Sequence, residues 1–150
     1  MAPLIFLLTT FILLYAVNRF FLKGQLSPSF IGRAALAVML IVTGITHFTG
    51  TDLMVEMMPD FLPYKKDIVY LTGILELLAV VGLLINKTSK LTVVMLIIYF
   101  IAVLPANIIG SLKQVNLGGM ESGAVYLWFR VPLQIFFIFW TYYFGIRLNK

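Results

Sequence analysis

The chain has 150 residues, of which 61% are hydrophobic and only 11% are charged. With a mean hydropathy of +1.03, this composition excludes an ordinary soluble domain and indicates an all-α membrane protein. The absence of cysteine and the single histidine exclude disulfides, thiolate chemistry, iron–sulfur clusters and a metal or haem site built from this chain alone, so no intrinsic cofactor is expected. The net charge of +5 comes from scattered basic residues at predicted helix ends, which excludes nucleic acid as a partner.

The first predicted helix covers about residues 3–22 and is almost wholly apolar. It has neither the positively charged leader nor the small-residue cleavage site of a secretory signal, so we expect it to remain as a transmembrane helix. Its only ionisable residue, Arg19, lies at an end from which its side chain can reach the bilayer surface. This helix is therefore predicted to lie at the periphery and to contribute little chemistry.

The second predicted helix covers about residues 29–48, after a turn marked by Gly24 and Pro28. Thr43 and His47 are four residues apart on this helix. Residues at that spacing lie on one helical face. We expect both side chains to point in the same direction.

The connection at residues 49–66 contains a short apolar segment that is rich in methionine. Thr51 and Asp52 are predicted to cap a short helix here, and Pro59 and Pro63 to end it. The segment is too apolar for an exposed turn. Two interpretations remain open: an interfacial or re-entrant segment over the bundle, and an ordinary half-buried loop helix.

The third predicted helix, at about residues 67–86, has a single carboxylate near its middle, Glu76. A charge at that depth costs several kcal/mol unless a partner or water meets it. Thr72, Gly73 and Ala79 lie one turn away from it on the same face. Small residues in such a stripe allow a neighbouring helix to approach closely. We therefore expect Glu76 to face into the bundle.

A tight basic turn at residues 86–90 is predicted to lead into a fourth helix at about 91–111. Near the far end of this helix are Pro105 and Asn107. Proline removes one backbone hydrogen bond and bends a helix, and in a membrane the freed carbonyl needs water, a cavity or a neighbouring group. Asn107 is expected either to satisfy the backbone at this kink or to contact a ligand.

The last predicted helix covers about residues 124–146, after a glycine-containing loop at 112–123. Its tyrosines and tryptophans cluster at its two ends, which is typical of the aromatic belts at the membrane surfaces. Pro132 lies inside it and is expected to bend it. The chain is thus predicted to form a single transmembrane domain, residues 1–150, with five spans.

Charge placement predicts the orientation of these spans. One side receives seven basic residues, and the other receives three together with most of the acids. The positive-inside rule then places the amino terminus outside and the carboxyl terminus in the cytoplasm, in a bacterial inner membrane. The seven are Arg19, Lys23, Arg33, Lys87, Lys90, Arg147 and Lys150; the three are Lys65, Lys66 and Lys113.

Arg130 is the one basic residue that this pattern leaves unexplained, because it lies about two turns inside the last helix. Gln134 is one turn deeper on the same face, and both are natural partners for Glu76. At about 1.5 Å per residue, His47 and Asn107 should lie near the outer mouth, Arg130 somewhat deeper, and Glu76 and Gln134 deepest. We therefore expect a small polar cavity in the outer half of the membrane, roofed by the methionine-rich connection.

Seven residues are candidates for ligand binding or proton relay, two prolines are expected to kink the helices beside them, and no catalytic residue or metal ligand is assigned. The seven candidates are Glu76, Arg130, His47, Asn107, Gln134, Thr43 and Thr72, and the prolines are Pro105 and Pro132. For His47, a purely structural role is an open alternative.

Five runs of residues, in order, resemble the DoxX family of small membrane proteins. They are Gly32-Arg33 through Gly44-Ile45-Thr46-His47-Phe48; Met58-Pro59 with Leu62-Pro63; Leu71-Thr72-Gly73-Ile74-Leu75-Glu76 to Gly82-Leu83-Leu84; Leu104-Pro105-Ala106-Asn107-Ile108; and Leu127-Trp128-Phe129-Arg130-Val131-Pro132-Leu133-Gln134. The resemblance covers about residues 30–146 and implies a four-helix transmembrane bundle, to which the first helix is added. Members of that family resemble subunits of thiosulfate:quinone oxidoreductases, and distant eukaryotic relatives resemble assembly or trafficking factors.

Three functional hypotheses follow. As a quinone-side subunit, the protein would use His47, Arg130 and Gln134 as hydrogen-bond donors and Glu76 as a proton relay, and a partner redox subunit would supply the electron carrier. As a non-enzymatic scaffold or assembly factor, it would use the pairing of Glu76 with Arg130 to fix helix register. A small-anion or lipid carrier would use Arg130, but no inverted repeat supports it.

Other expected partners are membrane lipids and a further copy of the chain. Whether the protein has any catalytic activity is open.

Overall fold

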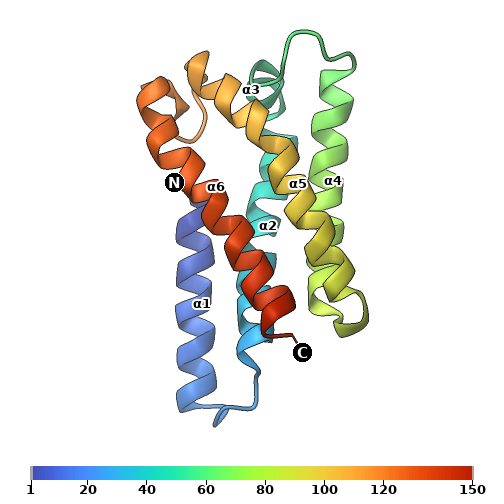
Figure 1. The fold of residues 1–150 in the computed structure, drawn as a ribbon, viewed down its shortest axis with the longest axis vertical. Coiled ribbons are helices and arrows are strands. Elements are labelled where there is room, and N and C mark those ends of the chain that lie inside the picture. The colour runs from blue at the N-terminus through green and yellow to red at the C-terminus, as the bar shows by residue number, and fades with distance from the viewer. Residues whose placement is uncertain (1, 150) are drawn as a thin grey trace.

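The computed structural model describes residues 2–149, which form an all-helical fold. The five long helices are α1 (Ala2–Phe20), α2 (Pro28–Thr49), α4 (Lys65–Leu84), α5 (Asn86–Leu112) and α6 (Ala124–Tyr142). Three short elements accompany them: α3 (Thr51–Glu56), the 3₁₀ turn η1 (Met120–Ser122) and the π-helical turn η2 (Tyr143–Arg147), which continues α6 (Figure 1). Within the described residues, five helical segments are long and apolar enough to cross a membrane. The predicted helical fold with five spans is confirmed at this level.

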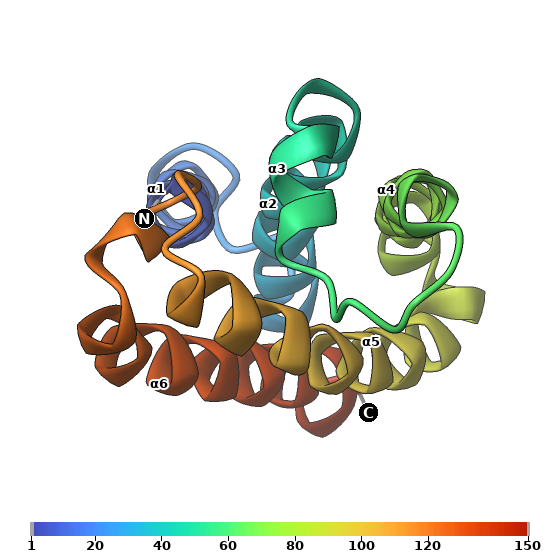
Figure 2. The same ribbon diagram turned by 90° about the horizontal axis from the view of Figure 1, so that it is seen from above.

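The helices form two layers, seen most clearly from above (Figure 2). One layer contains α1, α2 and α4, with α2 in the middle, and the other contains α5 and α6, which run side by side. The central helix packs against both of its layer neighbours, so it is the most buried of the five spans.

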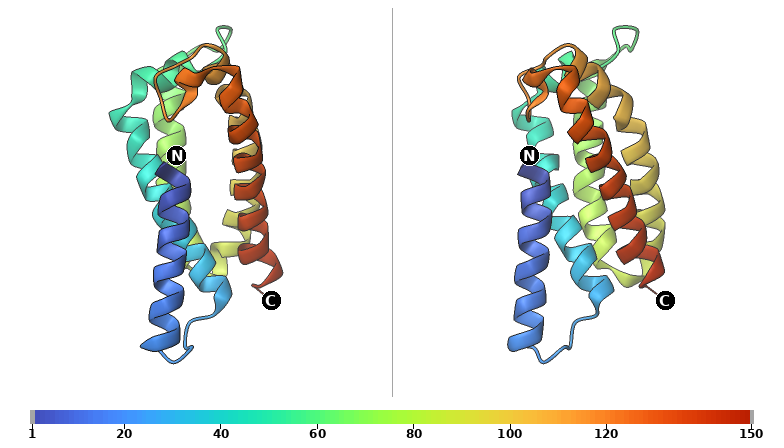
Figure 3. Two further views of the ribbon diagram at one scale, coloured as in Figure 1. Left: turned by 90° about the vertical axis from the view of Figure 1, so that its left-hand side faces the viewer. Right: turned by 60° about the vertical axis from the view of Figure 1, so that its left-hand side comes forward.

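The two ends of the bundle differ. The end called here the α3 end holds α3 and the connection from α5 to α6, whereas the opposite end holds the α1–α2 turn, the α4–α5 turn and the end of α6 (Figure 1). α1 begins part of the way along the bundle and extends beyond the other helices at the opposite end (Figure 3). It packs mainly on α2, at the edge of its layer, as predicted.

Side-chain hydrogen bonds stabilise both ends of the turn between α1 and α2. The Asn18 amide donates to the Leu26 carbonyl (3.0 Å) and accepts from the Leu26 N–H (2.9 Å), which closes the loop between α1 and α2. The Ser27 hydroxyl accepts from the Phe30 N–H (3.1 Å), and Pro28 follows as the first helical residue. This N-cap, followed by proline at the first helical position, explains why α2 begins here.

The prediction of a basic turn at residues 86–90 is wrong, because α5 already begins at Asn86. Ile85 alone links α4 to α5, and its carbonyl accepts from the N–H groups of Thr88 and Ser89. The Thr88 hydroxyl donates to the Gly82 carbonyl (3.0 Å), satisfying a backbone group at the end of α4. These local bonds let the chain reverse within one residue.

The expected capping of α3 by Thr51 and Asp52 is also wrong. Gly50 is the residue before the helix, and no side chain caps it. The Thr51 hydroxyl instead donates to the His47 carbonyl (2.7 Å) of the preceding helix, and Asp52 pairs with Lys66 (3.0 Å). The Thr51 hydrogen bond therefore ties α3 to α2, whereas the exposed pair of Asp52 and Lys66 adds little stability.

Large apolar side chains point outward along the long helices. Examples on different helices are Leu13 (65% exposed), Leu78 (62%), Leu91 (68%) and Ile135 (61%). Apolar surface of this extent is typical of contact with lipid rather than with water. The arrangement supports an integral membrane protein.

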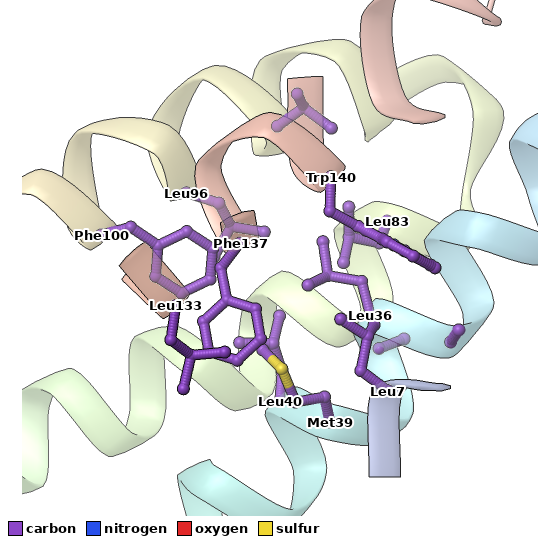
Figure 4. Close-up of a cluster of buried hydrophobic side chains, with 13 residues drawn as sticks. Leu7, Leu36, Met39, Leu40, Leu83, Leu96, Phe100, Leu133, Phe137 and Trp140 are labelled. Carbon is purple, nitrogen blue, oxygen red and sulfur yellow. The ribbon is translucent and has the colours of Figure 1, made fainter. Parts of the chain in front are cut away.

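A cluster of buried apolar side chains fills the space between the two layers (Figure 4). Leu7 of α1, Leu36 and Leu40 of α2, Leu83 of α4 and Phe137 of α6 are among its members. In a membrane, van der Waals packing rather than exclusion of water stabilises such a cluster.

Candidate functional site

A cavity of about 340 Å³ lies between the layers, on the α3 side of the apolar cluster. Its size falls within the roughly 300–1,000 Å³ of small-molecule sites. All seven residues that the sequence singled out line it: Thr43 and His47 from α2, Thr72 and Glu76 from α4, Asn107 from α5, and Arg130 and Gln134 from α6. The structure thus brings the candidates together, while their roles in binding or proton relay remain predictions.

The Glu76 carboxylate is 5% exposed and receives hydrogen bonds from two other helices. Its Oε2 accepts from the Thr43 hydroxyl (2.5 Å), and its Oε1 accepts from the Tyr99 hydroxyl (2.6 Å). The Nε2 of His47 lies 3.5 Å from the same Oε1. Three helices, α2, α4 and α5, therefore meet at this one carboxylate.

The imidazole of His47 is held between α2 and α4. Its Nδ1 lies 3.1 Å from the Val69 carbonyl oxygen and 3.1 Å from the Thr72 hydroxyl oxygen. The Thr72 hydroxyl also donates to the Val69 carbonyl (2.8 Å). Gly73 makes this approach possible, because a Cβ there would lie 2.7 Å from the His47 Cβ. The predicted small-residue stripe around Glu76 thus contacts α2.

Arg130 lies on the α6 wall of the cavity. Its Nη2 donates to the Asn107 side-chain oxygen (2.9 Å) of α5. Its Nε is buried and has no hydrogen-bond partner among the described residues. Water cannot reach this nitrogen, so it is the rest of the guanidinium that lines the cavity.

Glu76 and Arg130 share the cavity but do not form the ion pair that the sequence suggested. None of the ion pairs within residues 2–149 joins them. The Glu76 carboxylate instead accepts from two hydroxyls and lies beside an imidazole, and the Arg130 guanidinium donates to an amide oxygen. The Gln134 amide donates to the Phe100 carbonyl (2.7 Å) rather than to Glu76.

The two prolines that were expected to bend their helices lie near the cavity, Pro105 in α5 and Pro132 in α6, and both helices continue past them. The bond from Gln134 to the Phe100 carbonyl links these two helices in the same region. Proline therefore does not end either span, and a side chain of one helix meets the backbone of the other.

Methionines cover the cavity at the α3 end. Met54, Met57 and Met58, from α3 and the residues after it, line the cavity together with Met120 of η1. The structure confirms a methionine-rich roof; its depth relative to the membrane surface remains a prediction. Methionine is flexible and polarisable, so such a roof adapts readily to ligands of different shape.

An ionic contact connects this roof to the rest of the α3 end. Asp60 lies between α3 and α4, 2.9 Å from the Lys113 amine at the end of α5 and 3.5 Å from that of Lys65. The hydrogen bond from Lys113, and then its charge, lower the pKa of the Asp60 carboxyl. Because Asp60 is 85% exposed, the contact orients the loop but adds little stability.

Sequence analysis missed Tyr99, whose hydroxyl completes the Glu76 site. Its position held a usable signal, because Tyr99 is thirteen residues from each end of α5, at Asn86 and Leu112, and so far from both aromatic belts. A tyrosine hydroxyl buried at mid-span needs a polar partner.

Arg33 is a second residue whose environment differs from the expectation. The sequence placed it among the basic residues at the membrane surface, but it is 3% exposed. Its guanidinium donates to the Leu83 carbonyl (2.9 Å) and to the Asn86 side-chain oxygen (2.8 Å). It therefore ties α2 to the turn between α4 and α5.

Comparison with known proteins gives one match. Residues 36–145 match a protein family described as a domain of unknown function (DUF8561). No curated protein and no solved structure matches the chain. The matched segment contains all seven candidate residues and Tyr99, whereas α1 lies outside it.

Proposed function

The chain belongs to the DUF8561 family, and we propose that it is an integral membrane protein that binds a quinone in its cavity. The observation that carries the proposal is the Arg130 guanidinium, which lines a largely apolar cavity and forms no ion pair among the described residues. A charge inside a membrane span costs several kcal/mol unless a partner or water meets it. A ligand oxygen in the cavity that accepts from this guanidinium would lower that cost.

The two polar walls of the cavity suit the two carbonyl oxygens of a quinone ring. One oxygen would accept from Arg130 on α6, and the other would face the cluster of Glu76, His47 and Tyr99. Between these walls the lining is largely apolar, with Met39, Phe100, Val103 and Phe137 among its residues. A few placed polar groups in an apolar pocket are typical of small-molecule sites.

The cavity is partly open, which gives a lipophilic ligand a route from the bilayer. Ala2 and Pro3, at the start of α1, line its edge. α1 begins only part of the way along the bundle (Figure 3), and α2 and α6 make few contacts with each other. We propose that an isoprenoid tail passes between α2 and α6, beside the first residues of α1.

Electrons for any reduction or oxidation would come from a partner. The chain has no cysteine and only one histidine, so we propose that a partner redox subunit carries the electron-transfer group. The membrane subunit described here would hold the quinone and supply polar contacts and protons.

We also propose that α2, α4, α5 and α6 form a bundle of the DoxX type, to which α1 is added. The family match begins inside α2, at residue 36, and so leaves α1 outside, which supports this division. The resemblance to DoxX proteins also favours the quinone over other lipophilic ligands, because members of that family resemble quinone-linked oxidoreductase subunits.

The proposed orientation has the amino terminus outside and the carboxyl terminus in the cytoplasm of a bacterial inner membrane. Basic residues at the opposite end from α3, among them Lys23, Lys87, Lys90 and Arg147, support it. Reporter fusions to each terminus should place them on opposite sides, with the carboxyl terminus inside. Both termini on one side would contradict the five-span topology.

Quinone binding can be measured with the purified protein in lipid nanodiscs, titrated with short-chain ubiquinone and menaquinone analogues. Losing a hydrogen bond from a charged group costs about 1.5–3 kcal/mol, so Arg130→Leu should raise the dissociation constant by about ten- to a hundredfold. Trp128→Leu is the matched control, because this side chain on α6 is 86% exposed. It should leave the affinity unchanged.

A scaffold or assembly factor is the second candidate, and the contacts that Glu76 already makes within the protein favour it. Thr43, Tyr99 and His47 meet the carboxylate from within the protein, so this site fixes helix register without any ligand. If neither quinone analogue binds, or if Arg130→Leu leaves binding unchanged, this candidate replaces the quinone site. Native mass spectrometry should then show a co-purifying polypeptide, whereas a quinone of the native membrane supports the first proposal.

A further inference from the structure

We infer that His47 and Glu76 hold one proton between them and act as a single proton donor to the cavity, with Tyr99 as a positioning residue. The transfer of that proton to a ligand rests on the proposed function. The position of the proton does not, because it is a property of the protein without ligand.

The hydrogen bonds around Nδ1 of His47 decide which ring nitrogen is always protonated. The Val69 carbonyl oxygen, 3.1 Å away, can only accept. The Thr72 hydroxyl gives its own hydrogen to that carbonyl (2.8 Å), so its oxygen faces Nδ1 as an acceptor. An unprotonated Nδ1 would point its lone pair at the Val69 oxygen. The network therefore assigns a hydrogen to Nδ1.

With Nδ1 protonated, the other ring nitrogen faces the carboxylate. In a neutral ring Nε2 is an acceptor, and it lies 3.5 Å from Oε1 of Glu76. Two acceptors without a proton would repel each other, and two protons would leave a buried cation without its carboxylate. One proton, on Nε2 or on the carboxyl group, satisfies both residues.

Apart from Arg130, the polar groups around the pair are uncharged, so the number of protons on the pair sets the charge of this side of the cavity. Thr43 from α2, Thr72 from α4 and Tyr99 from α5 are neutral hydroxyls, and among the residues lining the cavity only Arg130 of α6 adds a further full charge. With one proton the pair is neutral overall. When it loses that proton it becomes an anion, which faces the Arg130 cation across the same cavity.

The proton transfer balances without any electron movement. The N–H bond at Nε2, or the O–H bond of the carboxyl group, breaks, and an O–H bond forms on the ligand oxygen. The pair is left as neutral imidazole and carboxylate. A quinone that gains electrons from a partner redox subunit would thus obtain one of its two protons here.

Tyr99 acts on this proton through Glu76. Its hydroxyl donates to Oε1 (2.6 Å), the same oxygen that faces His47. A hydrogen bond to a carboxylate stabilises the charged form. Tyr99 therefore holds that oxygen in place and favours the proton on the imidazole.

The chain contains a single histidine, so its nitrogens can be observed without assignment. We would label histidine with ¹⁵N, reconstitute the protein in quinone-free nanodiscs at neutral pH, and record long-range ¹H–¹⁵N spectra. The infrared carboxylic-acid band, in the difference between wild type and Glu76→Gln, reports the proton on Glu76. If that variant does not fold, ¹³C labelling of the three glutamates gives the same information.

The expected result is a hydrogen on Nδ1 in every molecule, with the occupancies of the Nε2 proton and of the Glu76 proton summing to one. A neutral ring protonated at Nε2 instead of Nδ1 would overturn the inference. So would a sum near zero or near two.

Tyr99→Phe tests the positioning role by the same spectra. It should lower the Nε2–H occupancy and raise the carboxylic-acid signal by the same fraction. Thr72→Val, which keeps the Val69 carbonyl beside Nδ1, is the matched control and should preserve the hydrogen on Nδ1. An unchanged proton distribution in Tyr99→Phe would remove Tyr99 from the unit.

The two proposals can fail separately. If the spectra show the shared proton but the quinone analogues do not bind, the proton pair stands and the ligand is wrong. If the analogues bind with the Arg130 dependence described above but the proton count differs from one, the quinone site stands and the shared proton is wrong.

Discussion

Glu76→Gln is expected to lower the free energy of unfolding by about 1–3 kcal/mol, because one of two hydroxyls loses its hydrogen bond to a charged group. The carboxylate accepts from Thr43 through one oxygen and from Tyr99 through the other, and glutamine offers only one oxygen. Tyr99→Phe removes one donor and should cost about 0.5–1.5 kcal/mol. Reversible unfolding in mixed micelles measures both losses.

The double variant should lose less than the sum of the two single losses. Coupling between polar groups in a membrane bundle averages about 0.6 kcal/mol and reaches about 1.7 kcal/mol, and the short contact between Tyr99 and Glu76 (2.6 Å) favours the upper part of that range. Glu121→Gln is the matched control, since this glutamate is exposed outside the long helices, and should change stability by less than about 0.5 kcal/mol. Strict additivity of Glu76→Gln and Tyr99→Phe would show that the hydroxyl and the carboxylate do not interact.

Unfolding measurements also distinguish the observed contacts of Glu76 from the direct ion pair with Arg130 that the sequence suggested. A direct ion pair predicts that Glu76→Gln and Arg130→Met are each worse than their combination, because each strands a charge. The structure gives Arg130 a different partner, Asn107, so these two changes should be nearly additive.

The sequence was sufficient to predict that the polar residues converge. A carboxylate at mid-span and a guanidinium two turns inside another span must both avoid lipid. Counting rise per residue placed all three in the outer half of the membrane, with His47 nearest the mouth, Arg130 deeper and Glu76 deepest, and all three line one cavity.

The sequence was not sufficient to predict which of these residues touch. Depth along a helix follows from counting, but rotation about its axis depends on packing against the neighbours. Here the close contact at Gly73 between α2 and α4 brings His47 and Thr43 to Glu76. The Glu76 carboxylate therefore has partners on α2 and does not pair with Arg130. Arg33 illustrates the same limit, because only the packing of the α4–α5 turn shows that its guanidinium is buried.

Gly73→Ala should disturb both the stability of the bundle and the proton pair. A Cβ at this position would lie 2.7 Å from the His47 Cβ and 3.0 Å from the Phe48 ring, so α2 and α4 must separate. Overpacking of this kind costs about 1–3 kcal/mol, which exceeds the roughly 1 kcal/mol that alanine gains over glycine in a helix. We therefore expect a net loss in the free energy of unfolding.

The shift of α2 would also move His47 away from Glu76, from which it is already 3.5 Å distant. In the ¹⁵N spectra of Gly73→Ala, the Nε2 resonance should therefore change. Gly82→Ala is the matched control on the same helix, because its added Cβ would meet Thr92, away from the cavity. That variant should alter stability but leave the histidine spectrum as in the wild type. If Gly73→Ala were as stable as the wild type and its histidine resonances did not move, the close approach of α2 and α4 that builds the site would be wrong.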